Sequence, residues 1–294
     1  MYYRRKIVLA LLQTFGETMG KTKFQKLLML FTQMQDKPDY HFVPYKYGCF
    51  SFQAMADLST MQKYQQLTIS NTGITKIDST DYIAALKEGD RKELNKLYLQ
   101  HKSKDYTDLI KYTYRKYPYF AIHSEIAGRY LTKEEVGKVK QHKPVDTRTV
   151  LYTIGYEGIT LEEYLNKLIA KDVKVLVDVR NKPMSMKYGF TKSQLLNACT
   201  SVGLLYVHFP EVGIVSEQRQ DLGKQSDYDK LFERYRKETL PQTITTQQQI
   251  LLLLKDKNRI ALTCFEANIC QCHRKHLAEA IIRLPDWNYE LIHL

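Results

Sequence analysis

Apolar and polar positions follow two different periods along the chain, and the period changes about halfway. In residues 1–140, apolar side chains recur at the three- and four-residue spacing of amphipathic helices, for example in residues 7–15. Residues 39–50 and 67–77 are instead short, rich in aromatic or β-branched side chains and interrupted by glycine, which predicts small hairpins. The pattern predicts a mainly helical amino-terminal domain of the winged-helix kind. Residues 132–148 are polar and lysine-rich, and we expect them to link it to a second domain.

From residue 149 onward, apolar runs of strand length alternate with helical patterns. Residues 150–154 and 173–178 are two such runs, and the helix between them begins at a capping box formed by Thr160 and Glu163. A strand–helix–strand unit predicts that its two strands pair in parallel through a right-handed crossover. Later strands are expected at residues 204–209, 260–265 and 289–294. We therefore predict an α/β protein in which residues 149–294 form a Rossmann-like, mostly parallel sheet.

The chain is basic, and its basic residues are concentrated in the first half. Of its 294 residues, 44% are hydrophobic, which is enough for a folded core, and the formal net charge is +12. Residues 1–147 hold 24 Lys and Arg against 15 Asp and Glu. A positive surface favours an anionic partner, and we expect nucleic acid, DNA in particular. Lys21, Lys23 and Lys26 of the second predicted helix are expected to face its phosphates. The alternative is a solvated lysine face on a domain that only packs.

No stretch predicts a signal peptide or a membrane span. The apolar runs at residues 7–12 and 250–254 are far shorter than the roughly 20 residues that cross a bilayer. The 5 cysteines are an odd number and are not arranged as a disulfide framework. We therefore expect a reducing, cytoplasmic setting and no membrane partner, while the oligomeric state is left open.

Polar side chains with catalytic potential follow the predicted strands. Because the carboxyl ends of parallel strands meet at one edge of a sheet, we expect these side chains to line one crevice. In chain order they are Tyr156 and Glu157 after the first strand, Asp178, Arg180 and Ser185 after the second, His208 at the end of the third, and Cys264, Glu266, His273 and Arg274 after the fourth. The last four lie before the start of a helix, where the helix amino terminus favours an anion.

The carboxylates in this set suggest hydrolysis of an N-glycosidic bond. Asp178 and Glu266 are assigned catalytic roles, one stabilising an oxocarbenium-like sugar while the other activates water. The chain would then be a hydrolase of the DNA glycosylase type. Three alternatives stay open. The same carboxylates could hold a divalent ion in a metal-dependent nuclease. The domain could be a non-catalytic sensor of nucleotides or modified DNA. The pair formed by Asp178 and Arg180 could be a structural salt bridge.

The remaining side chains of the crevice are assigned to substrate binding. Arginines bind phosphate in a bidentate manner, and aromatic rings stack on a base that has been flipped out of a duplex. The rings of Tyr156 or Phe190 are the candidates for stacking. The predicted substrate-binding residues are Tyr156, Glu157, Arg180, Ser185, His208 and Arg274.

The cysteines near the fourth strand support a second kind of chemistry. A thiolate of Cys264 at a helix amino terminus, beside His273 and Arg274, would be nucleophilic, and we assign Cys264 and His273 catalytic roles. An alternative is that Cys270, Cys272 and His273 bind zinc with Cys264 as a third thiolate, but their spacing is poor for a structural zinc site because there is no Cys-x-x-Cys pair. The plain alternative is that reduced cysteines fill small apolar spaces. No cofactor is required by any motif; a divalent metal is possible, and no glycine-rich loop supports NAD or ATP.

Four ordered blocks stand out in residues 149–294: residues 153–158, residues 178–180 with Pro183 and Ser185, Gly203 with residues 206–210, and residues 264–266 with 272–274. Together they resemble the domain-of-unknown-function 488 family. Residues 212–214 depart from the family, which more often has Leu-Gly-Gly there. The resemblance implies an α/β fold and implies no particular activity. In the first half, residues 45–51 resemble a segment of SocA-type antitoxin-associated domains.

Overall fold

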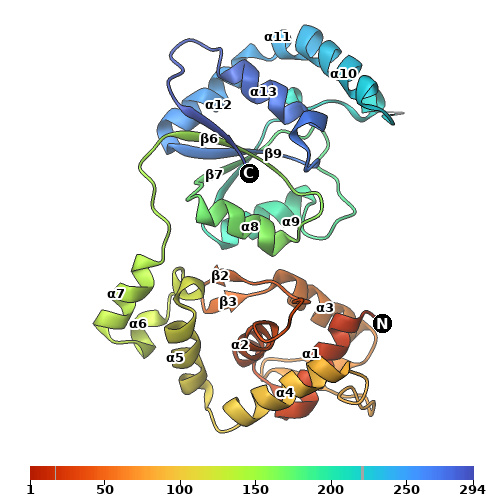
Figure 1. Ribbon diagram of the computed structural model, residues 1–294, viewed down its shortest axis with the longest axis vertical. Coiled ribbons are helices and arrows are strands. Elements are labelled where there is room, and N and C mark those ends of the chain that lie inside the picture. Colours follow the sequence, from red (N-terminus) through yellow and green to blue (C-terminus); the bar gives the residue numbers. More distant parts are fainter. Residues whose placement is uncertain (17, 220–221) are drawn as a thin grey trace. The chain divides into compact units, whose positions relative to one another are not determined.

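The computed structural model describes residues 1–16, 18–219 and 222–294. The chain divides into two compact units, Met1–Lys143 and Pro144–Leu294, which are described here one after the other (Figure 1). Among the described residues, no helix is both long and apolar enough to cross a membrane.

The first unit is mainly helical, with short strands between its helices. Its helices are α1 (Tyr3–Phe15), α2 (Lys21–Thr32), α3 (Phe52–Lys63), α4 (Glu88–His101), α5 (Tyr106–Lys116), α6 (Ala127–Tyr130) and α7 (Lys133–Gln141), with a 3-10 turn at Pro118–Ala121. Its strands are β1 (Thr18–Met19), β2 (Val43–Tyr45), β3 (Gly48–Phe50), β4 (Leu67–Ile69) and β5 (Ile74–Lys76). The strands form an antiparallel sheet in the order β1-β5-β4 and a separate hairpin of β2 and β3. Both hairpins that the sequence predicted are therefore present.

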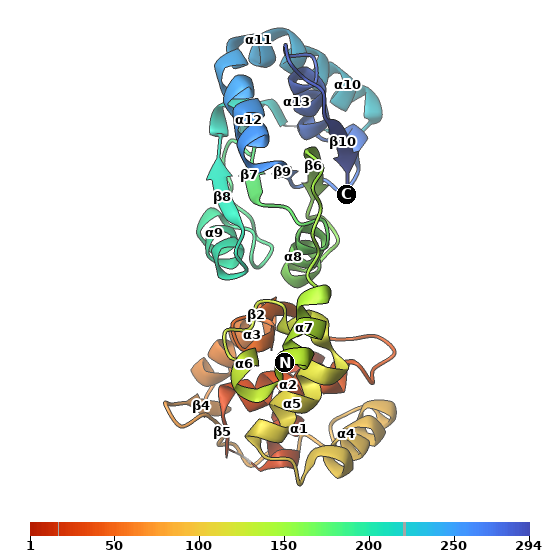
Figure 2. The same ribbon diagram turned by 90° about the vertical axis from the view of Figure 1, so that its left-hand side faces the viewer.

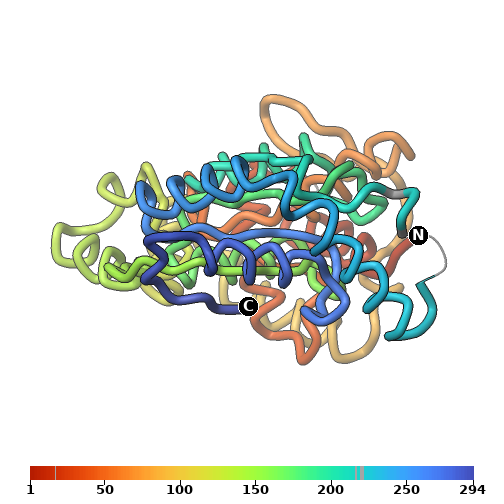
Figure 3. The backbone as a smooth tube through the Cα atoms, turned by 90° about the horizontal axis from the view of Figure 1, so that it is seen from above, coloured from red at the N-terminus to blue at the C-terminus, as the bar shows by residue number. Residues whose placement is uncertain are grey.

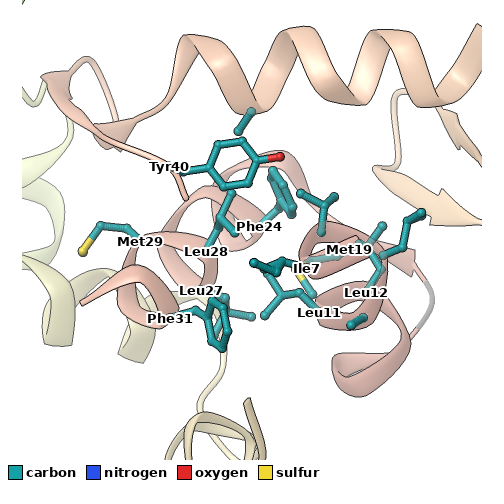
Figure 4. Packing of buried hydrophobic residues seen from close by; sticks show 14 of the residues in the cluster. Ile7, Leu11, Leu12, Met19, Phe24, Leu27, Leu28, Met29, Phe31 and Tyr40 are labelled. Atoms are coloured by element: carbon teal, nitrogen blue, oxygen red, sulfur yellow. The ribbon is translucent and has the colours of Figure 1, made fainter. Parts of the chain in front are cut away.

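The core of the first unit is built where α1 and α2 face each other (Figure 4). A polar network at the edge of this core ties α1 to α3. Asp57 on α3 is buried, and it accepts hydrogen bonds from Nε of Arg4 at 2.6 Å, from Nε of Arg5 at 2.8 Å and from the hydroxyl of Tyr40 at 3.0 Å. Burial alone would raise the pKa of Asp57, but the two arginines and the tyrosine hold it below its ordinary value.

Helix α7 lies inside the segment that the sequence predicted to be a linker. The side chain of Thr132 accepts a hydrogen bond from the backbone of Glu135, and the Glu135 carboxylate accepts one from the backbone of Thr132. This capping box starts the helix, and Val139 buries its side chain. The interpretation of residues 132–141 as linker was therefore wrong, because high lysine content also fits the exposed face of a surface helix.

The second unit is a parallel sheet covered by helices. Its strands are β6 (Val150–Gly155), β7 (Val175–Asp178), β8 (Leu205–His208), β9 (Arg259–Cys264) and β10 (Glu290–His293). Its longer helices are α8 (Leu161–Ala170), α9 (Lys192–Ser201), α10 (Gln225–Arg234), α12 (Ile244–Lys257) and α13 (His273–Ile281). Shorter helical pieces lie at Pro210–Val212, Ser216–Arg219, Tyr235–Thr239, Leu240–Gln242 (α11) and Ile269–Gln271.

The five strands lie in the order β10-β6-β9-β7-β8, and every described pair is parallel. The α/β class and the parallel, Rossmann-like sheet are confirmed. The predicted direct pairing of β6 with β7 was wrong, because β9 lies between them and pairs with both. β9 is buried along its whole length, as a central strand requires.

Two layers of helices cover the sheet. Helices α8 and α9 lie on one face, and α12 and α13 lie on the other (Figure 2). Seen from above, α12 and α13 run side by side across their face (Figure 3). The capping box of Thr160 and Glu163 forms as predicted at the start of α8. This arrangement leaves the carboxyl ends of β6, β7 and β9 next to one another, at Gly155, Asp178 and Cys264.

Candidate active site

A pocket of about 340 Å³ opens at the carboxyl ends of β6, β7 and β9. Its wall combines a thiol, an imidazole and cationic groups with several apolar side chains. The lining residues are Tyr156, Arg180, Asn181, Lys182, Met184, Ser185, Met186, Ile214, Cys264, Phe265 and His273. Five of the predicted site residues, Tyr156, Arg180, Ser185, Cys264 and His273, therefore lie around one cavity.

Asp178 ends β7 and is fully buried beneath this pocket wall. Its Oδ1 accepts from Nε of Arg180 at 2.8 Å and from the Arg180 backbone at 3.1 Å. Its Oδ2 accepts from the second arm of the same guanidinium and from the hydroxyl of Tyr206 at 2.7 Å. Both oxygens are thus occupied by the protein, and Asp178 is not among the pocket-lining residues. The contacts favour the structural salt bridge over a role as catalytic base.

The guanidinium of Arg180 is held from the other side by aromatic residues. Its Nη1 donates to the hydroxyl of Tyr156 at 2.7 Å and to the carbonyl of Phe190 at 2.8 Å. Burial would lower the pKa of Arg180, but its bonds to Asp178 and the charge of that carboxylate raise it above its ordinary value. The arginine is therefore a fixed positive charge at the pocket wall.

The rings of Tyr156 and Phe190 stack on each other, with centroids 4.1 Å apart and planes 9° apart. Both rings are buried. They do not offer a free face to a base, as the sequence interpretation supposed, because each already covers the other. The exposed aromatic ring of the pocket belongs instead to Phe265, which is 40% exposed.

Cys264, at the end of β9, lies between a carboxylate and an imidazole. Its Sγ is 3.2 Å from Oε2 of Glu266 and 3.6 Å from Nδ1 of His273, the first residue of α13. The thiol and the imidazole are buried and both line the pocket. Three of the four side chains predicted to be catalytic, Cys264, Glu266 and His273, are therefore in contact. The fourth, Asp178, is not part of this group.

The proton on His273 is placed by the backbone. Its Nε2 lies 2.9 Å from the carbonyl oxygen of Val179, which only accepts hydrogen bonds. Nε2 therefore carries the proton, and in the neutral ring Nδ1 is the acceptor that faces the thiol of Cys264. This orientation suits a base that takes a proton from the sulfur.

Arg274 and Glu157 shape the loop that carries Glu266. Arg274 is buried and donates to the backbone carbonyls of Glu266 and Ala267, so it does not present its guanidinium to a phosphate. Glu157 accepts from the backbone N–H of Ala267 at 2.9 Å. Both side chains support the loop; the burial of Arg274 argues against its predicted role in substrate binding, while that role stays a prediction for the exposed Glu157. The loop approaches β6 so closely that a Cβ at Gly155 would lie 2.0 Å from the carbonyl oxygen of Glu266.

His208 is also engaged by the protein. Its Nε2 lies 2.8 Å from the carbonyl oxygen of Arg180 and its Nδ1 lies 3.1 Å from Nζ of Lys192. Because the carbonyl fixes the proton on Nε2, the other nitrogen accepts from the lysine. His208 does not line the pocket. Its contacts fit a role in holding the segment after β7 rather than in binding substrate.

Cys272 was not predicted as a site residue, but the structure places it next to the thiol. The ligating atoms of Cys264, Cys272 and His273 lie within 4.8 Å of one another. Cys272 is buried, and burial together with Cys264 raises the pKa of its thiol well above the ordinary value. Cys270 is exposed. The sequence holds a signal for this grouping, since Cys272 directly precedes His273 and Cys264 was a candidate third thiolate, although the spacing of the cysteines did not favour a zinc site.

Tyr206 and Lys187 were also missed. Tyr206 lies two residues before His208 on β8, and this alternation places both side chains on the face of the strand toward the segment after β7. Lys187 donates from Nζ to the carbonyl of Tyr156 at 2.7 Å, and burial lowers its pKa. No pattern in the loop around Lys187 predicts that contact.

The three lysines predicted to face phosphates differ in exposure. Lys21 is exposed and Lys23 is half-buried on the first turn of α2. Lys26 is buried, donates to the carbonyl of Tyr47 at 2.9 Å and lies 4.7 Å above the ring of Tyr114. Burial lowers the pKa of Lys26. Lys26 is therefore not available to a phosphate, because its position on the helix faces the core.

Residues 160–281 match the family model described as "Domain of unknown function DUF488". The match runs from the start of α8 to the end of α13 and includes Asp178, Arg180, Cys264, Glu266 and His273. It does not extend into Met1–Lys143, so the similarity of that unit to antitoxin-associated domains stays a prediction. No curated protein and no solved structure matches the chain. The resemblance to this family is thus confirmed over residues 160–281, which contain three of the four sequence blocks, while the first block, residues 153–158, lies outside the match.

Proposed function

We propose that the chain is a nucleic-acid-directed hydrolase in which Cys264 and His273 carry the chemistry. The observation behind this proposal is that Sγ of Cys264 lies 3.6 Å from Nδ1 of His273, whose Nε2 is held by the carbonyl of Val179. A nucleophile next to a base that is oriented by a third group is the arrangement of nucleophilic catalysis. Because both side chains belong to the pocket wall, a substrate bound there would lie against them.

The chemistry follows from this arrangement. The thiol, which donates to Oε2 of Glu266 in the resting site, turns its proton to Nδ1 of His273, and the thiolate attacks an electrophilic carbon of the substrate. The bond from that carbon to the leaving group breaks, and the leaving group takes the proton from the imidazole. Water then gives a proton to His273 and attacks the same carbon. This second step breaks the bond to sulfur, and the proton returns to restore the thiol of Cys264.

Glu266 indicates which bond of a nucleotide is attacked. Its carboxylate lies 3.2 Å from the nucleophilic sulfur. A negative charge at that place stabilises the positive charge that develops on a sugar when its N-glycosidic bond breaks. The same charge repels the anionic phosphorus centre of a phosphodiester. We therefore favour hydrolysis of an N-glycosidic bond over strand cleavage, with Glu266 and not Asp178 as the carboxylate that assists it.

The pocket wall suits a base attached to a phosphate backbone. Met184, Met186, Ile214 and Phe265 give it apolar surface for a flat ring. Lys182 and the fixed charge of Arg180 lie on the same wall, where they attract phosphate. The cavity of about 340 Å³ is large enough for a single nucleotide unit rather than for a duplex.

We also propose that the first unit holds the nucleic acid, DNA in particular. The order α1, β1, α2, β2, β3, α3, β4, β5, in which β1, β5 and β4 form a three-stranded antiparallel sheet, supports the winged-helix interpretation. The concentration of Lys and Arg in residues 1–147 supports contact with phosphates. The 5 free cysteines support a reducing, cytoplasmic location.

A product survey by mass spectrometry tests the proposal. The full chain and its Cys264→Ala variant are incubated with unmodified and naturally modified DNA and RNA, in the presence of a chelator. Cys270→Ser serves as the matched control, because it alters an exposed cysteine of the same loop that does not line the pocket. We expect a released base and an abasic site from the unaltered chain and from the control, and at least about 1,000-fold less product from Cys264→Ala.

Other results would point elsewhere. Cut strands that appear only when Mg²⁺ is added would favour the metal-dependent nuclease. The absence of any product, together with salt-sensitive DNA binding, would favour the sensor, an alternative that the engaged carboxylate of Asp178 also supports. If the Cys264→Ala variant has the same turnover as the unaltered chain, the proposed role of the Cys264 thiol as nucleophile is wrong.

A further inference from the structure

Two thiols and one imidazole meet at the base of the pocket. Sγ of Cys264, Sγ of Cys272 and a ring nitrogen of His273 all lie within 4.8 Å of one another, and all three residues are buried. We propose that these side chains bind one thiophilic divalent ion, Zn²⁺, and that the bound ion switches the site off. Only the effect on turnover rests on the proposed function, because binding of the ion does not depend on it.

The distances agree with tetrahedral coordination. With Zn–S bonds of about 2.3 Å and Zn–N bonds of about 2.0–2.1 Å at the tetrahedral angle, a sulfur and a nitrogen ligand lie about 3.5–3.6 Å apart. Sγ of Cys264 and Nδ1 of His273 are 3.6 Å apart. These two ligands therefore need little movement to share an ion, and Cys272 lies close enough to complete a group of three.

The backbone already orients the imidazole as a metal ligand. A histidine that binds zinc through one nitrogen usually donates the other N–H to a carbonyl or carboxylate, which fixes the tautomer. In His273 this partner is the carbonyl of Val179, 2.9 Å from Nε2. Nδ1 therefore points its lone pair toward the sulfur of Cys264, where the ion would lie.

The charges of the three ligands match a divalent ion in a buried place. Two thiolates and a neutral imidazole carry two negative charges, which Zn²⁺ cancels, so that the ion and its three ligands together carry no net charge. Thiolate and imidazole are donors that zinc prefers over the oxygen ligands of Mg²⁺. The fourth coordination position faces the pocket, since Cys264 and His273 both line it.

The same ion would disable the proposed chemistry. It takes the electron pair of the Cys264 sulfur and the lone pair on Nδ1 of His273, which are the nucleophile and the base. Cys272 supplies neither the nucleophile nor the base of that chemistry, so its proposed role is to bind the ion. Through Cys272, a high concentration of zinc would thus inhibit the enzyme.

Titration of the metal-free full chain with Co²⁺, a coloured substitute for Zn²⁺, tests the site. We expect one ion per chain, with the ultraviolet charge-transfer absorption of thiolate–cobalt bonds, displaced by one equivalent of Zn²⁺. Cys272→Ser should weaken binding by more than about 100-fold, since changes even to outer-shell partners cost 10–100-fold. Cys270→Ser is the matched control, because this exposed cysteine lies two residues away and is outside the group.

A second measurement uses the unaltered chain and does not depend on how a variant folds. Alkylation mapped by mass spectrometry should slow at Cys264 and Cys272 when zinc is added and stay unchanged at Cys270. Absence of cobalt binding, or equal binding by Cys272→Ser, would overturn the site. Zinc that binds and raises turnover would overturn the switch. If zinc binds these three side chains but the chain has no turnover with any substrate, the metal site is supported and only the proposed hydrolase function is contradicted.

Discussion

Asp178 and Arg180, two residues apart in the chain, form a buried pair in which both carboxylate oxygens accept from the one guanidinium. The pair joins the end of β7 to Tyr206 on one side and to Tyr156 on the other. It therefore fixes the wall on which the pocket depends, without placing the carboxylate in the pocket.

Removal of the charge of Asp178 should destabilise the second unit. Asp178→Asn leaves the guanidinium of Arg180 buried without its counter-ion, and breaking such a pair costs about 3–5 kcal/mol. The free energy of unfolding is measured by urea denaturation followed by circular dichroism. The double variant Asp178→Asn/Arg180→Met should recover part of the loss. An unchanged urea midpoint together with abolished turnover would instead restore Asp178 to the reaction.

A methyl group at Gly155 should displace the loop that carries Glu266. The new Cβ would lie 2.0 Å from the carbonyl oxygen of Glu266, a contact that only backbone movement relieves. Overpacking of this kind costs about 1–3 kcal/mol, and turnover should fall as the carboxylate moves away from Cys264. Thermal unfolding and product release are compared with those of Gly223→Ala, whose Cβ meets no atom within 4 Å. Equal behaviour of the two variants would contradict the role of this close approach.

The stability of the first unit should depend on pH through Asp57. Its arginine and tyrosine partners hold its pKa below the ordinary value of about 3.9. A depressed folded-state pKa adds stability that is present above the unfolded pKa and is lost as pH falls through the folded one. Urea unfolding between pH 6 and pH 2 should therefore show a steeper loss below about pH 4 in the unaltered chain than in Asp57→Asn. Parallel curves for the two proteins would assign the acid sensitivity to other groups.

Lys21 and Lys26 should affect DNA binding differently. Lys21 is exposed, and if it contacts a phosphate, Lys21→Ala should lower the slope of log K against log salt by about 1. Lys26 is buried against Tyr47 and Tyr114, so Lys26→Met should leave that slope unchanged. Binding of the full chain to a DNA duplex is measured by fluorescence anisotropy between 50 and about 300 mM salt. A slope that changes only with Lys26 would contradict the orientation of α2.

The strands and helices of the second unit could be predicted from the sequence because each has its own local pattern of apolar and polar residues. Val175–Asp178 and Arg259–Cys264 are mostly apolar runs of strand length. The capping box of Thr160 and Glu163 marks the start of a helix. The order of the strands in the sheet could not be predicted from the sequence, because no local pattern shows that β9 lies between β6 and β7. Strand pairing is decided by contacts between residues far apart in the chain.

The sequence predicted where the site residues lie more successfully than it predicted what each of them does. The sequence placed Cys264, Glu266 and His273 at one crevice, since strand ends converge. It could not show that Arg274 and Glu157 bond to the backbone of the loop or that Asp178 is enclosed, because a polar side chain that supports a site and one that acts in it look alike in sequence. Only the positions of their partners separate the two.

The insertion of β9 between β6 and β7 also governs how the protein is made. A ribosome releases β6, β7 and β8 well before Arg259–Cys264, so the facing edges of β6 and β7 stay unpaired in the nascent chain. Such edges are sites of aggregation until a strand covers them, and pairing between distant segments folds slowly. The strand that joins the two parts of the sheet is the one that ends in Cys264. A chain cut short before Arg259 therefore lacks the central strand and the reactive thiol together, and it is open to proteolysis before any chemistry begins.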